Sequence, residues 1–126
     1  MSADGVRVAV CHGTPRSDMD PIFATDVNAT MVRSLLDGAE ADVLVLGHSH
    51  VPMLLALAGR GGIVVNPGAL GRMNLGGGWM CDAATGTFTP LDAERGMFAV
   101  LELPAREFKV MPVSDGAEVE IARRRF

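Results

Sequence analysis

Three histidines are the residues of this sequence whose type and spacing point most directly to chemistry. His12 stands alone, whereas His48 and His50 form a His-x-His pair, and the 126 residues contain no other histidine. Neutral imidazole is the commonest side-chain metal ligand near neutral pH. In an extended backbone, His-x-His places both rings on one face, where a histidine from a neighbouring strand can join them. The pattern therefore predicts a metal site made by His12, His48 and His50.

The first half of the sequence has the pattern of a strand, a helix and a second strand. Residues 6–11 and 42–46 are short apolar runs with β-branched residues, which is typical of buried strands. Between them, Thr25 or Asp26 is a candidate N-cap of a helix, and Gly38 is a candidate left-handed C-cap. The helix is expected to bury one apolar stripe, formed by Val27, Met31, Val32, Leu35 and Leu36.

This order of elements brings the histidines to one edge of the predicted sheet. Two buried strands joined by a crossover helix are expected to run parallel. His12 directly follows the first strand, and His48 and His50 follow the second. Ligands bind such sheets beyond the carboxyl ends of the strands. The adjacent Gly13 and Gly47 allow the backbone to approach a neighbour closely at this edge.

The second half of the sequence is expected to be β-structure. Residues 53–58 and 63–65 predict a hairpin, and Asn66-Pro67-Gly68 predicts a turn after it. Residues 59–78 contain eight glycines, which argues against long regular elements there. A turn at 82–86, a final hairpin over 97–103 and 108–113 and a short strand in the tail follow. In total we expect one helix and six or seven strands, in an α/β fold whose mixed β-sheet holds a βαβ unit followed by β-hairpins.

The composition excludes several classes of partner. A formal charge of −4 does not indicate the basic surface with which proteins bind nucleic acid or an anionic membrane. No apolar run approaches the roughly 20 residues of a membrane helix, and the N-terminus lacks the basic region of a secretory signal. Cys11 and Cys81 form no disulfide framework, so both are expected to be reduced and buried. We therefore expect a cytoplasmic protein that contacts neither nucleic acid nor membrane.

Three segments around these residues carry a family resemblance. They read Val-Cys-His-Gly-Thr-Pro-Arg-Ser at 10–17, Val-Leu-Gly-His-Ser-His-Val-Pro at 45–52 and Val-Asn-Pro-Gly-Ala-Leu-Gly at 65–71. In this order they resemble the C-terminal half of a calcineurin-like metallophosphoesterase, and most of all the small bacterial and archaeal phosphodiesterases of that superfamily. The resemblance covers residues 5–71 well and the hairpin over 97–113 loosely.

The resemblance implies a fold, a reaction and a site. The fold would be an α/β/β/α sandwich of two facing mixed sheets flanked by helices. The reaction would be hydrolysis of a phosphodiester or phosphomonoester substrate by a metal-activated hydroxide. Two divalent ions would be bound, manganese in the first place, with iron, zinc or nickel as alternatives. By analogy, His12 and His48 would hold one ion and His50 the other, while the predicted substrate-binding residues are Arg16, Asn66 and Arg72.

The sequence also departs from that family. The family's Asp-x-His, Gly-Asp and Gly-Asn-His motifs are absent, and with them the histidine assigned as the general acid, so no catalytic residue is identified. We therefore expect residues 1–126 to be a single, N-terminally truncated phosphoesterase domain. The strand at 6–11 would then have an exposed edge, which a homo-oligomer or a partner chain would cover.

Two alternatives stay open on the sequence alone. One is a non-catalytic scaffold or interaction protein that retains the fold. The other is a mononuclear metal-binding protein with three histidine ligands. In that case Asp18 or Asp20, in the loop after His12, would add a carboxylate, although both residues also suit loop formation or helix capping.

Overall fold

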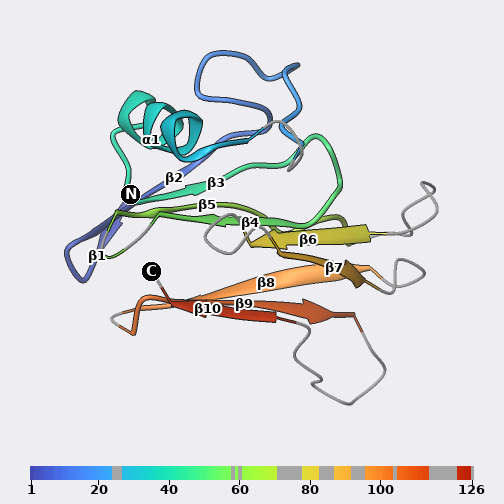
Figure 1. Cartoon of the computed structure of the whole chain (residues 1–126). Coiled ribbons are helices and arrows are strands. Elements are labelled where there is room, and N and C mark those ends of the chain that lie inside the picture. Colours follow the sequence, from blue (N-terminus) through green and yellow to red (C-terminus); the bar gives the residue numbers. More distant parts are fainter. Residues whose placement is uncertain are drawn as a thin grey trace.

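The described part of the chain forms three layers (Figure 1). A computed structural model describes residues 1–23, 27–57, 59, 61–70, 78–82, 87–91, 96–103, 105–113 and 122–125. Helix α1 (Ala29–Gly38) lies on the outer face of a seven-stranded mixed sheet with the order β1-β2-β3-β5-β4-β6-β7. Its strands are β1 (Ser2–Ala3), β2 (Val6–Val10), β3 (Val43–Val45), β4 (Met53–Ala56), β5 (Ile63–Asn66), β6 (Gly78–Asp82) and β7 (Thr87–Leu91).

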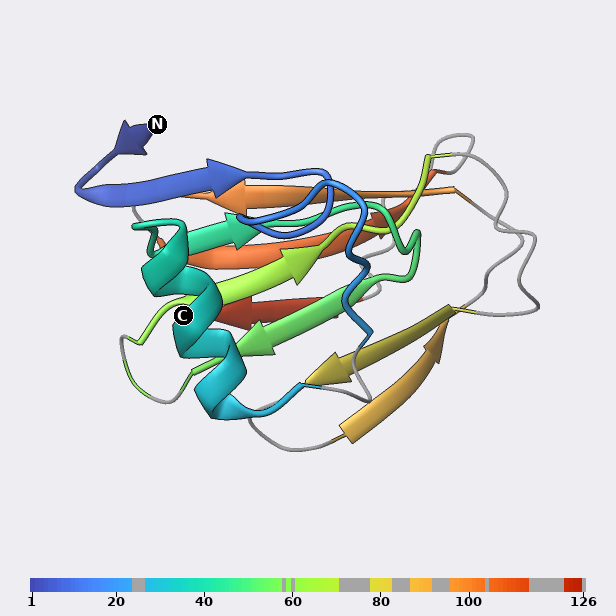
Figure 2. The same cartoon turned by 90° about the horizontal axis from the view of Figure 1, so that it is seen from above.

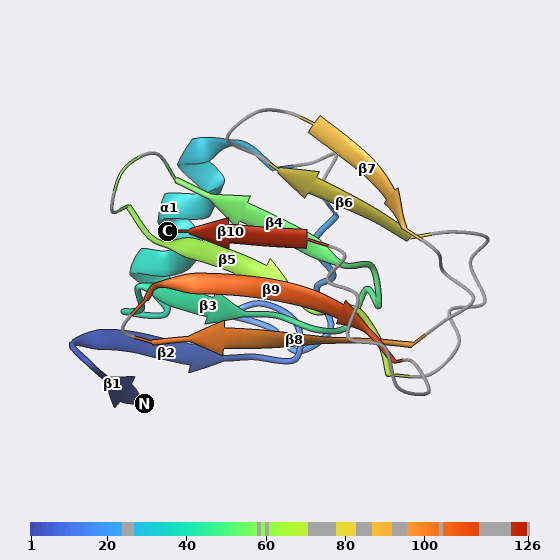
Figure 3. The same cartoon turned by 90° about the horizontal axis from the view of Figure 1, so that it is seen from below.

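A three-stranded antiparallel sheet forms the third layer. It has the order β10-β9-β8, from β8 (Met97–Glu102), β9 (Glu107–Pro112) and β10 (Ala122–Arg125). Seen from below, it lies over the face of the larger sheet opposite α1, with its strands roughly aligned with those of that sheet (Figure 3). The predicted fold class is confirmed, with one helix and ten strands in the described residues where six or seven strands were expected. Within those residues, no helix has the length and apolar character needed to span a membrane.

The predicted βαβ unit is present. Strands β2 and β3 run parallel, with Val8 opposite Val43 and Val10 opposite Val45. Strand β5 runs parallel to β3 and also forms the predicted hairpin with β4. The carboxyl ends of β2, β3 and β5 therefore meet at one edge of the sheet, as the parallel arrowheads in Figure 2 show.

Two apolar cores hold the layers together. Side chains alternate between the faces of a strand, so Leu54 and Ile63 face the smaller sheet while Leu55 and Val64 face α1. Both faces of β4 and β5 are buried, which explains their continuous apolar sequences. Burial of each large aliphatic side chain contributes about 1.5–3 kcal/mol. These cores fix the strand ends, and with them the loops at the carboxyl edge.

The helix begins and ends later than predicted. Its N-cap is Asn28, whose Oδ1 accepts a 2.9 Å hydrogen bond from the N–H of Met31. The predicted caps Thr25 and Asp26 are therefore wrong, and both lie outside the described residues. Gly38 is the last helical residue, and the left-handed position belongs to Glu40, with φ 49°.

The end of α1 has the hydrogen bonds of a Schellman motif. The N–H of Glu40 donates to the carbonyl of Asp37, and the N–H of Ala41 donates to that of Leu36. These bonds satisfy the last carbonyls and carry the chain directly into β3. A glycine in the sequence was therefore a misleading marker of this cap.

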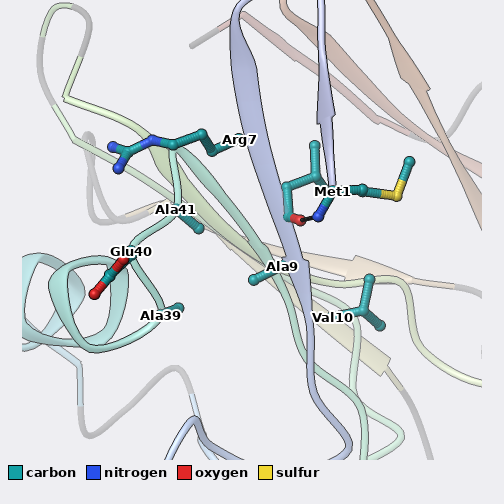
Figure 4. A pocket seen from close by; sticks show the side chains of 8 residues that line it. Met1, Arg7, Ala9, Val10, Ala39, Glu40 and Ala41 are labelled. Carbon is teal, nitrogen blue, oxygen red and sulfur yellow. Dashed lines mark hydrogen bonds between the residues drawn. The ribbon is translucent and has the colours of Figure 1, made fainter.

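The outer edge of β2 is partly covered. Strand β1 pairs with Val6 and Arg7, and Met1 exchanges backbone hydrogen bonds of 2.8 and 2.9 Å with Val8. Val10 lies beyond this pairing and is 69% exposed. A cavity of about 610 Å³ lies along the same edge, between β2 and the residues that follow α1 (Figure 4). The edge of β2 that was expected to be exposed is therefore largely covered, except near its last residue. That a homo-oligomer or a partner chain covers the remainder stays a prediction.

An ion pair joins the beginning of β3 to β2. The guanidinium of Arg7 donates from Nε to Asp42 Oδ2 at 3.2 Å and from Nη2 to Oδ1 at 3.0 Å, and the Arg7 backbone N–H donates to Oδ2 at 2.8 Å. These hydrogen bonds from Arg7 hold the pKa of Asp42 below its usual value of 3.8. The bonds from the side chain have the largest effect, and the backbone bond has the next largest. The carboxylate therefore stabilises the folded chain above that pH.

We expect Asp42→Asn to flatten the dependence of stability on pH in the acid range. A carboxyl group whose pKa is lowered by folding stabilises the native state fully above its unfolded-state pKa and loses that effect as the pH falls through the folded-state pKa. The variant should unfold a few degrees below the wild-type chain at pH 7. That difference should shrink as the pH falls below 3.8. Thermal unfolding between pH 7 and pH 2 measures it, and a constant difference over that range would contradict the expectation.

Candidate metal centre

Two loops at the carboxyl edge of the larger sheet carry the three histidines. His12 lies just beyond the end of β2, and His48 and His50 lie in the loop that follows β3. The backbone N–H of Gly47 donates a 2.9 Å hydrogen bond to the carbonyl oxygen of His12, which ties the loops together. The histidines are at the same edge, as predicted, because β2 and β3 run parallel.

The rings of His12 and His48 are in direct contact. Nδ1 of His48 lies 3.0 Å from Nε2 of His12, and the ring centroids are 4.9 Å apart with the planes inclined at 84°. One of the two nitrogens carries the proton of this hydrogen bond and the other accepts it. The structure thus brings together two of the three predicted metal ligands.

The spacing of these nitrogens suits two ligands of one metal ion. Two nitrogens that bind the same ion at about 2.1 Å lie about 3.0–3.4 Å apart when they subtend the angle of an octahedral or tetrahedral site. The observed separation is 3.0 Å. The two nitrogens therefore have the separation of two ligands of one ion. These residues fit a metal ion beside the pair once both rings turn so that each nitrogen lone pair points at the ion.

The backbone of the His-x-His pair differs from the prediction. Both His48, with φ 60°, and His50, with φ 57°, have left-handed conformations instead of the expected extended ones. His48 is the central residue of a three-residue turn, because the N–H of Ser49 donates to the carbonyl of Gly47 at 2.7 Å. The alternation of an extended strand therefore does not apply to this loop, and it no longer predicts that both rings share one face.

His50 is exposed and lies outside the contact between the other two rings. Within the described residues, no three histidine, cysteine, aspartate or glutamate side chains are grouped to hold a metal ion. Asp18 and Asp20, which the sequence offered as an additional carboxylate ligand, are exposed on the loop after His12. In the described part of the chain, the His12–His48 pair is therefore the nucleus of the candidate site.

Asn66 is buried beside this loop. Only 1% of the residue is exposed. Its Nδ2 donates to the carbonyl oxygen of Gly47 at 2.7 Å and to Ser49 Oγ at 3.0 Å, and its Oδ1 accepts from the N–H of Gly68 at 2.9 Å. The donors and the acceptor of the amide all bond to the protein. These contacts favour a positioning role over the substrate contact predicted for Asn66.

Sequence reasoning missed this connection between β5 and the histidine loop. The signal was present in Asn66-Pro67-Gly68, because asparagine side chains commonly bond to the backbone two residues later in turns. The two bonds from Nδ2 could not be predicted, because they depend on β5 lying next to β3. Ser49 was also overlooked, although it lies between the two histidines in the sequence and is only 8% exposed.

Arg16 lies on an exposed turn close to His12. The turn is closed by backbone hydrogen bonds between Thr14 and Ser17 in both directions, at 2.7 and 3.3 Å. Arg16 also lines a cavity of about 210 Å³ between this loop and α1. The other predicted arginine, Arg72, lies outside the described residues.

The two residues beside His12 have structural roles. A Cβ on Gly13 would collide with the backbone of Ser17 and Asp18, so the loop after His12 can close on itself only at a glycine. Cys11 is a free thiol, half-buried against the core beneath α1 instead of fully buried as expected. The side chain of Cys81 is outside the described part.

The chain matches a known protein family. A family model described as the calcineurin-like phosphoesterase superfamily domain matches residues 1–89. The matched segment contains all three histidines and Asn66. Comparisons with curated proteins and with solved structures found no match.

Proposed function

Because the chain belongs to the calcineurin-like phosphoesterase superfamily, we propose that it is a metal-dependent hydrolase of phosphodiesters or phosphomonoesters. The observation that carries the proposal is the 3.0 Å approach of His12 Nε2 to His48 Nδ1 at the carboxyl edge of the sheet. Members of this superfamily bind divalent metal ions, and this pair has the spacing of two ligands of one ion.

The histidines would divide between two metal positions. We propose that His12 and His48 hold one divalent ion and that His50, on the same loop, contributes to a second. Manganese is the ion that we propose first, on the family resemblance. Iron, zinc and nickel are the alternatives, and imidazole ligands suit all three.

The two predicted arginines would bind and orient the substrate. In such a site, divalent ions activate water and neutralise charge on the transferred phosphoryl group. The exposed guanidinium of Arg16 would bind phosphate oxygens through paired hydrogen bonds, and Arg72 is proposed for the same role. The free thiol of Cys11 is compatible with a cytoplasmic location, where thiols are kept reduced.

Hydrolysis of bis-p-nitrophenyl phosphate and p-nitrophenyl phosphate by the purified chain tests the proposal. We expect release of p-nitrophenol that depends on added Mn²⁺, stops with a chelator and falls at least 100-fold in His48→Ala. Activity that persists in both chelator and His48→Ala would contradict the assignment. A chain that binds Mn²⁺ but hydrolyses neither ester would support the alternative of a metal-binding protein without phosphoesterase activity.

A further inference from the structure

The loop that carries His48 and His50 has an unfavourable backbone. Left-handed φ angles of 60° and 57° occur at two non-glycine residues separated only by Ser49. Left-handed conformations are uncommon for residues with a side chain, and they persist where surrounding contacts impose them. Contacts around the loop must therefore impose this turn.

Asn66 supplies such contacts on both sides of His48. Its Nδ2 donates to the carbonyl oxygen of Gly47, the residue before His48, and to Oγ of Ser49, the residue after it. The hydroxyl of Ser49 also accepts from the N–H of Val51 at 3.4 Å. Both side chains of this clamp are buried, at 1% exposure for Asn66 and 8% for Ser49, so water does not replace their bonds easily.

We propose that Asn66 is a positioning residue that holds His48 ready to share a metal ion with His12. The amide of Asn66 brackets His48, and the N–H of Gly47 fixes the same turn to the carbonyl of His12. Without the clamp, the turn can relax toward an extended backbone and move the His48 ring away from His12. This inference rests on the proposed function, because it assigns a purpose to the geometry of that metal site.

The chemistry of the clamp requires an amide at position 66. An aspartate has nearly the same shape and keeps an oxygen for the N–H of Gly68, but it cannot donate to Gly47 and Ser49. Ser49→Ala removes only one of the two bonds that Nδ2 makes. Asn66→Asp and Ser49→Ala therefore form a graded series that leaves every histidine in place.

Zinc affinity and nuclear Overhauser effects test the clamp in the same variants. We expect Asn66→Asp to lower the affinity for Zn²⁺, measured by calorimetry, about 10- to 100-fold, as is typical when a residue that orients a metal ligand is replaced. Ser49→Ala should lower it less. In the metal-free chain, the strong intraresidue Hα–HN effect of a left-handed residue should weaken at His48 in both variants.

Asn28→Ala is the matched control. It removes the N-cap bond of α1 to Met31 and destabilises the chain without touching the histidine loop. Its zinc affinity and its Overhauser effects at His48 should equal those of the wild-type chain. Equal losses of affinity in Asn28→Ala and Asn66→Asp would overturn the clamp, because they would show a general effect of stability.

The outcomes separate the clamp from the proposed function. A wild-type chain that binds neither Zn²⁺ nor Mn²⁺ would overturn the proposed metal site, whatever the clamp does. If Asn66→Asp and Ser49→Ala bind Zn²⁺ as tightly as the wild-type chain, with unchanged Overhauser effects at His48, the clamp alone is overturned. If Asn66→Asp fails to fold, Ser49→Ala decides the question by the same two measurements.

Discussion

His48→Ala is expected to lower the affinity of the chain for Mn²⁺ at least 100-fold. The described site brings two imidazole nitrogens within 3.0 Å of each other, and His48→Ala removes one of them. The metal-free variant should lose less than about 1 kcal/mol of unfolding free energy, because His48 is on a partly exposed loop outside both cores. Calorimetric titration with Mn²⁺ and thermal unfolding in chelator measure the two effects.

His12→Ala and His50→Ala refine this expectation. His12→Ala should behave like His48→Ala, because each removes half of the same pair. His50→Ala leaves the pair intact, so binding of the first ion should persist and any loss should concern a second ion. Wild-type affinity in His48→Ala would refute the assignment, and so would a large loss of thermal stability in its metal-free form relative to the metal-free wild-type chain.

Gly62→Ala is expected to lower the free energy of unfolding by about 3 kcal/mol, a large loss for the addition of one methyl group. Gly62 has a φ of 95°, and an added Cβ would lie 2.7 Å from the carbonyl oxygen of Asp42 and 2.9 Å from Leu36 Cδ1. The same carbonyl accepts the N–H of Ile63 at the beginning of β5, so it cannot move away freely. The substitution therefore combines backbone strain with a collision between β3, β5 and α1.

Gly59→Ala isolates the contribution of the backbone to this loss. Gly59 is also left-handed, with a φ of 68°, but no atom lies within 4 Å of an added Cβ. Its substitution should cost only about 1–2 kcal/mol. Urea unfolding of both variants gives the comparison, and equal losses would show that the contacts around Gly62 relax without cost.

Much of the fold that positions the site could be predicted because it depends on short-range patterns. The apolar runs at 6–11 and 42–46 correspond to β2 and β3, and their parallel pairing follows from the intervening helix. The hairpins β4–β5 and β8–β9 were also predictable, because turn residues separate two apolar runs. The insertion of β5 between β3 and β4 was not, since it depends on packing among three strands.

The helix ends show why local signals were insufficient. Thr25 and Asp26 are residue types that suit an N-cap, as Asn28 is. The helix begins at Ala29, so only Asn28 is placed to accept the N–H of Met31. At the other end, the left-handed position went to Glu40 because Ala41 must bond back to Leu36 as the chain enters β3. At the C-terminal end, the path of the chain into β3 therefore overrode the preference for glycine at the left-handed position.

The site was predictable in position and not in geometry. His12 and His48 meet because parallel strands end at one edge. The left-handed turn at His48 and His50 and its clamp by Asn66 depend on a contact between β5 and the loop after β3, which no local pattern reports. The substrate-binding prediction for Asn66 arose from its place in a motif, whereas its burial favours positioning.

A crystal structure of the chain with bound Zn²⁺, located by its anomalous scattering, would show whether the His12–His48 pair is a metal site. We expect one ion at about 2.0–2.1 Å from both Nε2 of His12 and Nδ1 of His48, the two nitrogens that lie 3.0 Å apart in the described structure. Binding of the ion should displace the proton that these nitrogens share and turn both rings toward the ion. Zinc bound elsewhere, or bound to only one of the two rings, would contradict the proposal of a metal-dependent phosphoesterase built on the His12–His48 pair.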